Sequence, residues 1–325
     1  MMNTDELYLG IDLGGTNLKA IAMTGDGTRL CEMHRLAETE KGPKRLIEKM
    51  AALIEDVIGS CNASKKQFRA IGVAAAGIVD MQRGICRFLP NLPGWIDIPI
   101  VQELSQKVRL DTFLINDVRA MTLAEKRFGA GKGVNNLICL AVGTGIGGGI
   151  VIDGSLYFGS EGLACEIGHQ IIEPQGPRCT CGSRGCLEAL ASGSNIAYQA
   201  MRIVRQGATT LIRDMVKGDL NLITPEIVAD AARQGDRYAL EIWEREAYYL
   251  GLGLTNMVVV LNPDMIILGG GVAEAFDLLA QGIMATLRER VKLGHDLDRL
   301  QIVKSELKDL AGAIGAAAWA QVQGK

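Results

Sequence analysis

The sequence predicts an α/β protein of two lobes. The chain has 325 residues, and at roughly 150 residues per domain this length favours two domains over one. Short apolar runs alternate with segments of helical periodicity, which is typical of sheets covered by helices. A unit of strand, glycine-rich turn and strand occurs near the start of the chain and again near its middle, which indicates two related lobes.

Composition restricts the class of protein and the kind of partner. Hydrophobic residues make up 48% and charged residues 22% of the chain, which excludes disordered, collagen-like and disulfide-scaffold classes. The 40 glycines exceed the roughly 7% of an average protein and predict tight turns and close backbone contacts with ligands. The formal net charge of −3 provides no basic surface for nucleic acid or an anionic membrane, so we expect small-molecule partners.

The N-terminal residues and the cysteines indicate a cytoplasmic protein. Asp5 and Glu6 stand where a secretory signal carries basic residues. No apolar run approaches the ~20 residues that a membrane span needs. The 8 cysteines occur without an export signal, so we expect reduced thiols or metal ligands rather than disulfides.

The first half of the chain predicts a sheet that opens with a hairpin. The pair Gly14-Gly15 lies between two apolar runs and predicts the hairpin turn. The predicted strands cover residues 7–13, 17–23, 68–75 and 111–116, and the predicted helices cover residues 43–58 and 118–128. Asn116 and Asp117 therefore stand at the carboxyl end of a strand, where open α/β sheets bind ligands. Asp117 is a candidate general base there, and a helix N-cap is the alternative.

The second half repeats the strand–glycine–strand unit and adds a long helical region. Strands are predicted over residues 137–142, 150–152 and 265–268, and helices over residues 225–261, with a break near Gly235, and 310–321. We expect a small lobe of residues 1–115 plus 308–325 and a larger lobe of residues 116–307. No stretch rich in Pro, Gly or Ser separates them, so we expect a shared interface.

One histidine and three cysteines form the strongest local signal. His169 precedes Cys179, Cys181 and Cys186, which lie within eight residues of one another among Gly, Pro and Arg. Such a set fits a closed tetrahedral zinc site, although the spacing is not that of a zinc finger or ribbon. The alternative is three unrelated reduced thiols in a loop. Because four protein ligands leave no position for substrate, we expect a structural zinc ion.

Two glutamates flank this segment. Glu166 precedes His169 by three residues, and Glu188 follows Cys186 by two. Bound zinc would hold both carboxylates in fixed orientation, and carboxylates accept the hydrogen bonds that sugar hydroxyls donate. The alternative is a pair of surface glutamates with no ligand.

Three glycine-rich turns are candidates for phosphate binding through backbone amides. They lie at residues 12–16, 143–149 and 269–271. None matches the lysine-containing P-loop, and residues 143–149 lead into an apolar strand rather than a helix, unlike a dinucleotide fingerprint. One such turn is most often only a tight turn, but three favour a nucleotide. Asp12 is then a candidate ligand of hydrated Mg²⁺, with Thr16 or Lys19 as a phosphate contact.

Together these motifs resemble the ROK family of sugar kinases within the actin-like ATPase superfamily. The resemblance spans essentially the whole chain. Its motifs are residues 10–16, 116–117, 143–149, 166–169, 179–188 and 268–271. It implies a two-lobed α/β actin-like (ribonuclease H-like) fold with an interlobe cleft and a structural zinc loop. It also implies transfer of the γ-phosphoryl group of ATP to the 6-hydroxyl of a hexose, with Mg²⁺ bridging the phosphates.

The resemblance implies a role for each matched residue. Asp117 would be the base that takes the proton of the attacking sugar hydroxyl. The implied sugar contacts are Gly77, Asn91, Asn116, Asp117, Glu166, His169 and Glu188. The implied contacts of ATP are Asp12, Gly14, Gly15, Thr16, Lys19, Thr144, Gly145, Gly269 and Gly270. His169 would bind zinc through one ring nitrogen and sugar through the other.

Glucose is the expected substrate, because residues 187–193 and 261–264 are similar to the corresponding stretches of bacterial glucokinases. N-acetylmannosamine, N-acetylglucosamine and fructose stay alternatives, because Ala76 stands where many family members have proline in a loop that shapes the sugar site. Polyphosphate stays an alternative phosphoryl donor. Homodimers are common in the family, but no residue here specifies an interface.

Functions of other classes fit the same residues less well. A sugar-sensing regulator without turnover would not need Asp117. Repressors of the family carry a DNA-binding helix-turn-helix before the kinase-like body, and a first strand at about residue 7 leaves no room for one, so no nucleic-acid partner is expected. A zinc-dependent hydrolase would need an open position on the metal.

Overall fold

The computed structural model describes residues 6–61, 63–89, 92, 94–292 and 294–324, and the chain divides into two compact units. The first unit consists of Met1–Gly133, Leu156–Ala164 and Glu306–Lys325, and the second of Val134–Ser155 and Cys165–Ser305. The chain therefore passes four times between the units. The sequence placed the end of the small lobe at residue 115, whereas the first unit of the structure also includes the next helix and residues 156–164.

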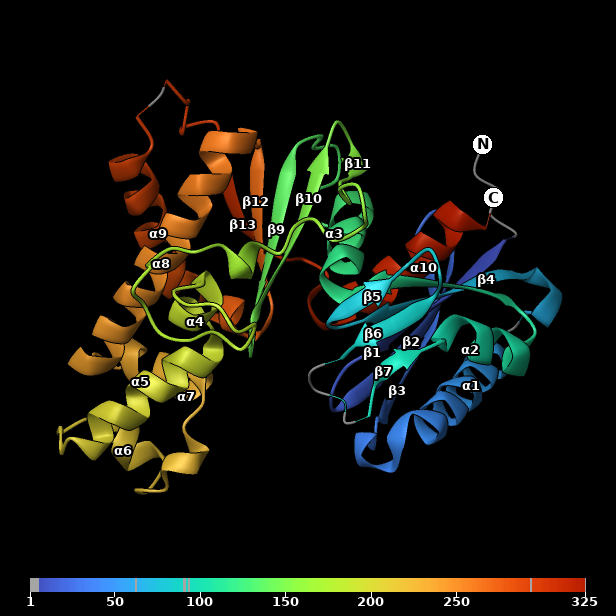
Figure 1. Ribbon diagram of the computed structural model, residues 1–325, viewed down its shortest axis with the longest axis horizontal. Helices are drawn as coiled ribbons and strands as arrows, with labels where there is room; N and C mark the ends of the chain where they lie inside the picture. Colours follow the sequence, from blue (N-terminus) through green and yellow to red (C-terminus); the bar gives the residue numbers. More distant parts are fainter. Residues whose placement is uncertain (1–5, 62, 90–91, 93, 293, 325) are drawn as a thin grey trace. The chain divides into compact units, whose positions relative to one another are not determined.

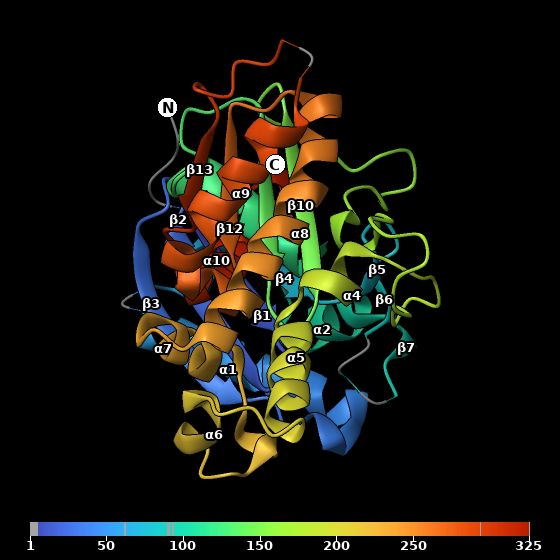
Figure 2. The same cartoon turned by 90° about the vertical axis from the view of Figure 1, so that its left-hand side faces the viewer.

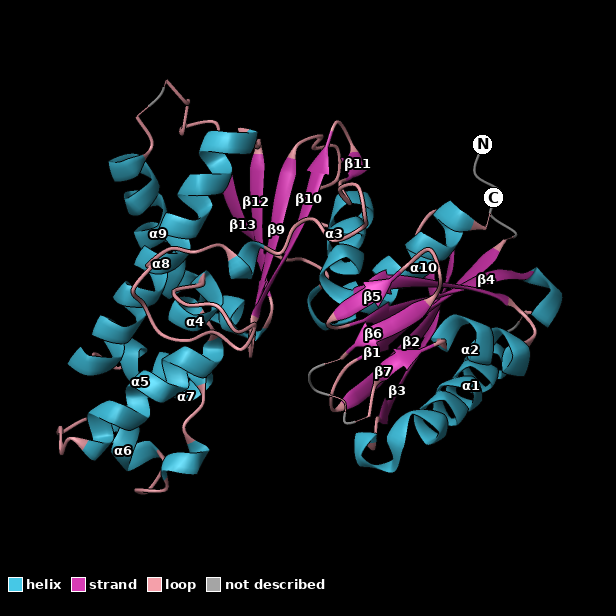
Figure 3. Ribbon diagram, viewed as in Figure 1, coloured by secondary structure: helices cyan, strands magenta, loops and turns pink. Residues whose placement is uncertain are grey.

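A five-stranded sheet forms the centre of the first unit (Figures 1 and 3). Its strands are β1 (Leu7–Leu13), β2 (Asn17–Thr24), β3 (Arg29–Leu36), β4 (Phe68–Ala75) and β8 (Asp111–Asn116). Their order is β3-β2-β1-β4-β8, in which β1 pairs antiparallel with β2 and parallel with β4, and β4 pairs parallel with β8. The predicted hairpin and both later strands are confirmed.

Helices cover both faces of this sheet. Alternate residues of β1 point to opposite faces, so Leu9 and Ile11 pack with α1 (Gly42–Ser60) and α2 (Ile100–Val108), while Tyr8 packs with α3 (Asp117–Phe128) and α10 (Ala311–Gln323). Helix α10 lies directly on β1, because a Cβ at Gly10 would lie only 1.9 Å from the carbonyl oxygen of Ala313. The glycine therefore permits a helix and a strand to approach more closely than side chains allow.

A smaller antiparallel sheet and a disulfide complete the first unit. The sheet has the order β5-β6-β7, with β5 (Ile78–Asp80), β6 (Ile85–Phe88) and β7 (Ile96–Ile98). Cys31 of β3 and Cys61 after α1 form a disulfide with their Cα atoms 6.2 Å apart. The expectation of reduced thiols or metal ligands is therefore wrong for this pair, because α1 packs on the sheet with its C-terminal end against the edge strand β3. Within the described residues, the other six cysteines form no disulfide.

The second unit repeats the strand order of the first. Its strands are β9 (Leu137–Val142), β10 (Ile146–Ile152), β11 (Ser155–Leu156), β12 (Met265–Gly269) and β13 (Gln301–Lys304). The order is β11-β10-β9-β12-β13, with an antiparallel β9–β10 hairpin and parallel β9–β12 and β12–β13 pairs. Both glycine-rich hairpins thus occupy the same place in their sheets, which supports the repeat predicted from the sequence.

Six helices pack around one apolar core of the second unit. They are α4 (Leu187–Ala191), α5 (Gly193–Arg205), α6 (Leu211–Met215), α7 (Pro225–Arg233), α8 (Arg237–Leu261) and α9 (Phe276–Arg290). Helices α8 and α9 lie side by side (Figures 1 and 2). The predicted break near Gly235 is confirmed, since α7 ends before it and α8 begins after it. Within the described ranges, none of the helices combines the length and the hydrophobicity that a membrane span requires.

Short 3-10 helices lie in segments that connect the other elements. They are η1 (Thr39–Lys41), η2 (Lys65–Gln67), η3 (Ile167–His169), η4 (Leu220–Leu222), η5 (Gly271–Ala275) and η6 (Lys308–Leu310). Three of them, η3, η5 and η6, carry or adjoin predicted site residues.

Candidate active site

Three parallel strands of the first unit end together and bring the predicted residues to one edge of the sheet. Leu13 of β1 is paired in register with Ala75 of β4, and Ala75 with Asn116 of β8. The carboxyl ends of these strands carry Asp12, Gly77 and the Asn116-Asp117 pair. This is the edge of an open α/β sheet at which ligands bind.

The carboxyl group of Asp12 lies against the first turn of α10. A Cβ at Gly312 would lie 2.6 Å from Asp12 Oδ2, so a side chain at this position would displace the carboxyl group. Burial, followed by the charge of Asp117, raises the pKa of Asp12 to about 7, although Lys19 opposes the shift. Two carboxylates that repel each other provide the oxygen ligands that Mg²⁺ prefers, so the residues present fit this ion.

Lys19 is engaged within the first unit. Its Nζ donates a hydrogen bond to the carbonyl oxygen of Asp309 at 2.9 Å and lies 3.5 Å from the Asp309 carboxylate. Asp309 belongs to η6, just before α10, and the sequence analysis did not identify it. In the hairpin turn itself, Gly14 donates to the carbonyl of Asn17 at 3.1 Å, while Gly15 and Thr16 are exposed. The turn therefore presents accessible backbone beside Asp12.

Asn116 is the N-cap of α3. Its Oδ1 accepts hydrogen bonds from the amides of Val118 at 3.1 Å and Arg119 at 3.2 Å, and its Nδ2 donates to the Gly77 carbonyl at 3.2 Å. The N-cap role that was the alternative for Asp117 therefore belongs to Asn116. Asp117 is the first helical residue, and its Oδ1 accepts from the Val118 amide at 2.9 Å. Asn91, the other predicted sugar contact near this edge, lies outside the described residues.

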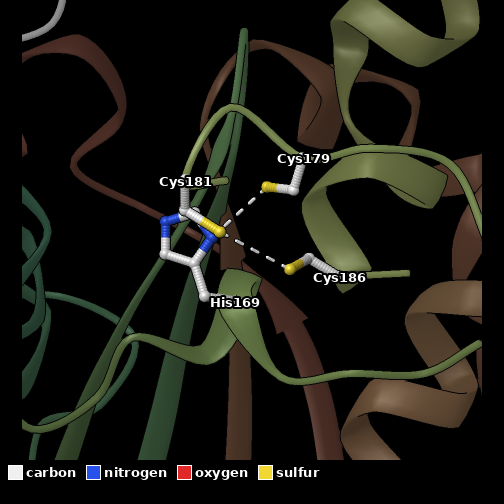
Figure 4. A group of neighbouring side chains, drawn as sticks. All are labelled: His169, Cys179, Cys181 and Cys186. Carbon is white, nitrogen blue, oxygen red and sulfur yellow. Dashed lines mark hydrogen bonds between the residues drawn. The ribbon is translucent and has the colours of Figure 1, made fainter. Parts of the chain in front are cut away.

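The predicted metal ligands of the second unit come together. The donor atoms of His169, Cys179, Cys181 and Cys186 all lie within 4.8 Å of one another (Figure 4). Cys179 Sγ is 3.6 Å from His169 Nδ1, and Cys181 Sγ is 3.7 Å from Cys186 Sγ. Three thiols and one imidazole nitrogen are the donor set of a closed structural zinc site. Because Nδ1 faces the thiols, Nε2 is the ring nitrogen that the dual role of His169 would use for sugar.

The thiols of this cluster need a cation to ionise together. Burial raises the pKa of the Cys186 thiol to about 12, and burial also raises the pKa of Cys179. A backbone hydrogen bond from Ser183 lowers the pKa of Cys181. Zinc binds thiolates, so its binding would release protons and add its free energy to the folding of the loop.

Glu188 joins the cysteine loop to the glycine-rich turn. Its Oε2 accepts from the Ile146 amide at 2.9 Å, and its Oε1 accepts from the Thr180 hydroxyl at 3.1 Å. A Cβ at Gly145 would lie 2.3 Å from Glu188 Oε2, so the carboxylate reaches the turn only because residue 145 is glycine. Both oxygens of Glu188 therefore have partners within the protein, a structural role that spacing in the sequence did not predict.

Glu166 and His169 lie at the two ends of η3. The His169 amide donates to the Glu166 carbonyl at 3.0 Å, which closes this single turn. The turn packs on β10, where a Cβ at Gly148 would lie 2.5 Å from Ile167 Cδ1. Residues three apart on a 3-10 turn lie above one another, so Glu166 and His169 belong to one face.

Backbone groups line a second edge in the second unit. Ala141 of β9 is paired in register with Gly269 of β12, so the turns that follow these parallel strands adjoin each other. Gly270 has a φ of 81°, and a Cβ there would lie 2.3 Å from the carbonyl oxygen of Val142. The Gly193 amide, at the start of α5, donates to the Gly143 carbonyl at 2.8 Å. Thr144, Gly145, Gly269 and Gly270 thus belong to neighbouring turns, as expected for a shared ligand.

One neighbour of this edge was not identified from the sequence. Glu226 lies in the first turn of α7, and its Oε1 would be 3.8 Å from a Cβ at Gly271. Acidic residues are common in the first turn of a helix, so Glu226 carries no distinguishing signal without the tertiary structure.

The fold and these residues define a class of protein. Two sheets of like order, each with a glycine-rich hairpin, together with a Cys₃His loop, are the features of an actin-like sugar kinase fold. The chain belongs to the ROK family, whose family model matches residues 8–323.

Individual relatives include both kinases and regulators. The chain is 36% identical to a glucokinase of Thermotoga maritima over 95% of each chain. It is 31% identical to a xylose repressor of Caldicellulosiruptor bescii, covering 95% of this chain and 77% of the repressor. Its structure matches that of a ROK family glucokinase from Streptomyces griseus in complex with glucose and AMPPNP, with a TM-score of 0.83, 31% identity, and coverage of 97% of this chain and 99% of the other.

Proposed function

We propose that the protein is an ATP-dependent hexose kinase that transfers the γ-phosphoryl group to the 6-hydroxyl of glucose. The observation that carries this proposal is the juxtaposition of Asp12 and Asp117 at the carboxyl ends of the parallel strands of one sheet. One carboxylate can bind a cation that also binds the phosphates, and the other can act as the general base. The relatives named glucokinase, and the solved complex of one with glucose and AMPPNP, support the choice of reaction and substrate.

In this proposal Asp117 takes the proton of the glucose 6-hydroxyl while that oxygen bonds to the γ-phosphorus of ATP. The bond from the γ-phosphorus to the bridging oxygen breaks, and ADP leaves with its electron pair. The other sugar hydroxyls are bound by Gly77, Asn91, Asn116, Glu166, His169 and Glu188. Because phosphoryl transfer requires mainly positioning and charge neutralisation, one base and several fixed contacts suffice.

The remaining predicted residues bind the donor. Gly14, Gly15, Thr16 and Lys19 contact phosphates from the first unit, and Thr144, Gly145, Gly269 and Gly270 contact ATP from the second. Asp12 would hold Mg²⁺, which neutralises the phosphate oxygens when bound. For Lys19 to reach a phosphate, its contact with Asp309 must break.

The metal of the cysteine loop has a structural role in this proposal. His169, Cys179, Cys181 and Cys186 would hold zinc, and the closed donor set leaves no place for a reactant. The ion would fix the segment that carries Glu166, His169 and Glu188. A cytoplasmic location stays a prediction of the sequence, and a homodimer is implied only by the resemblance to the family.

Release of ADP from Mg²⁺-ATP tests the function. The substrates are glucose, mannose, fructose, N-acetylglucosamine and N-acetylmannosamine, with polyphosphate as a second donor and Asp117→Asn as the blank. We expect the highest kcat/KM with glucose and ATP. Asp117→Asn should lower kcat at least about 100-fold and leave the dissociation constant for glucose within about threefold.

The opposite outcomes separate the alternatives. Turnover of another sugar would keep the kinase and correct its substrate. Glucose binding in calorimetry without ADP release would favour the sugar-sensing regulator, the class to which the repressor relative points.

A further inference from the structure

Helix α3 adjoins every point at which the chain passes between the two units. The crossings lie at residues 133/134, 155/156, 164/165 and 305/306. Leu156 packs against the apolar cluster that contains Ala120 of α3. The three other crossings are approached by chain segments that bond to two ionisable side chains of α3, Arg119 and Glu125, which are 3% and 0% exposed.

Glu125 holds two of these segments with its two carboxylate oxygens. Oε2 accepts from the amide of Ala130 at 2.9 Å, three residues before the chain leaves the first unit. Oε1 accepts from the amide of Leu307 at 2.9 Å, immediately after the chain returns. A Cβ at Gly129 would lie 2.2 Å from Oε2, so a side chain there would displace the carboxylate.

Arg119 holds the third segment, residues 156–164. Its guanidinium donates to the carbonyl oxygens of Gly162 and Ala164, the latter at 2.7 Å, and lies 5.9 Å from the ring centroid of Phe158. The segment is folded back on itself, since the Ala164 amide donates to the Phe158 carbonyl at 3.1 Å. Only Cys165 separates Ala164 from Glu166, a proposed sugar ligand.

Both of these ionisable side chains of α3 are buried. A buried charge is costly unless fixed dipoles or opposite charges surround it. Here the ionic groups point at backbone groups of the crossing segments and bind them through charge-assisted hydrogen bonds. The same helix begins with Asp117, so α3 carries both the expected base and the side chains that bind these segments.

We propose that Arg119 and Glu125 are positioning residues that anchor the joints between the two units on α3. This rests on the proposed function, because it takes Asp117 and Glu166 as contacts of the same sugar. Arg119 fixes the segment that leads to Glu166, and it does so from the helix that carries Asp117. Loss of this anchor is therefore expected to weaken the binding of sugar more than the binding of ATP.

The test compares Arg119→Met and Glu125→Met with Arg127→Met. Arg127 is a matched control, because it lies on α3 and donates to Gln321 and Ala318 of α10, and among the described residues it donates to no crossing segment. Arg119→Lys is the conservative variant. Hydrogen exchange of the unliganded proteins reports on the segments, and steady-state kinetics report KM separately for sugar and ATP.

We expect Arg119→Met to speed exchange in residues 156–164 and to raise KM for sugar, each about tenfold, with KM for ATP within about twofold. Glu125→Met should speed exchange in residues 129–133 and 306–310 by a similar factor. Arg119→Lys should recover part of both effects, and Arg127→Met should show neither.

Two outcomes would overturn the proposal. One is exchange in the crossing segments that matches the control, and the other is an unchanged KM for sugar despite faster exchange. Failure of the proposed function is recognised separately, since the unaltered protein would then release no ADP. In that case exchange, together with sugar affinity from calorimetry, still decides whether Arg119 anchors its segment.

Discussion

The register of three parallel strands brings the backbone positions of Asp12 and Asp117 to the same edge of the sheet. The resulting repulsion, added to burial, is why the pKa of Asp12 rises to about 7. A cation at this edge would remove the repulsion, which is the condition that a complex of Mg²⁺ and ATP supplies. We therefore expect the pair of carboxyl groups to destabilise the unliganded protein and to stabilise the complex with a cation.

Asp12→Asn tests this reading through the pH dependence of stability. The pKa of about 7 in the folded state exceeds the ordinary value of 3.8, so the folded state retains a proton that the unfolded state loses. The protonated Asp12 stabilises the folded state at a pH below 3.8. This stabilisation is lost as the pH rises from 3.8 to about 7. The variant lacks this loss, so its advantage over the unaltered protein should grow between pH 4 and pH 7 by on the order of 1.4 kcal/mol per pH unit.

Urea unfolding in magnesium-free buffer at pH 5, 6, 7 and 8 measures the difference. Asp309→Asn is the control, because Asp309 is exposed and also contributes to the field at Asp12. If the free energy of unfolding depends on pH in the same way in Asp12→Asn and in the unaltered protein, the raised pKa of Asp12 is contradicted. The variant is also expected to lose kinase activity at every pH.

The limits of individual strands show where prediction from the sequence succeeded and where it failed. Strands β1, β4, β8 and β9 have the limits expected from short apolar runs, and β1, β4 and β9 are buried over nearly their whole length, which leaves a continuous signal. Strand β3 was missed because it is an edge strand with no fully buried residue. Strand β10 begins earlier than predicted, at Ile146, since its glycines pair regularly with β9 despite their low strand propensity.

Contacts between distant elements were harder to predict. The disulfide between Cys31 and Cys61 depends on where α1 meets β3, which no local pattern reveals. The metal cluster was predicted because its four residues lie close in sequence. The contact of Glu188 with Ile146 and that of Lys19 with Asp309 join residues 42 and 290 positions apart, so only the tertiary structure shows them.

The cysteine loop is the element whose removal should have the clearest consequence. Cys181→Ser should lower bound zinc from about one ion per chain to near zero. It should also lower the melting temperature by several degrees and raise KM for sugar, because the loop orients Glu166, His169 and Glu188. Metal analysis, thermal unfolding and kinetics provide the three readouts.

Ser183→Ala is the matched control. The backbone of Ser183 accepts a hydrogen bond from the Cys179 amide and donates toward Cys181, and the substitution keeps both groups. Full activity of Cys181→Ser without metal would contradict a structural zinc ion.

The molecule as a whole consists of two units with one strand order, which confirms the repeat read from the two glycine-rich hairpins. Family membership was also predicted correctly from the motifs. The limits of the lobes differ from the prediction, because chain order suggests a boundary at the end of β8, whereas packing assigns α3 to the unit that contains α10. Residues 156–164 return to the first unit by contacts that no composition signal marks.

The central claim is that the protein converts glucose and ATP into glucose 6-phosphate and ADP with Asp117 as the base. Glucose 6-phosphate, measured by coupling to an NADP⁺-dependent glucose 6-phosphate dehydrogenase beside ADP in the same reaction, tests it most directly. We predict one glucose 6-phosphate for each ADP, and a loss of both by at least about 100-fold in Asp117→Asn. ADP without glucose 6-phosphate, or neither product from a protein that binds glucose, would contradict the account.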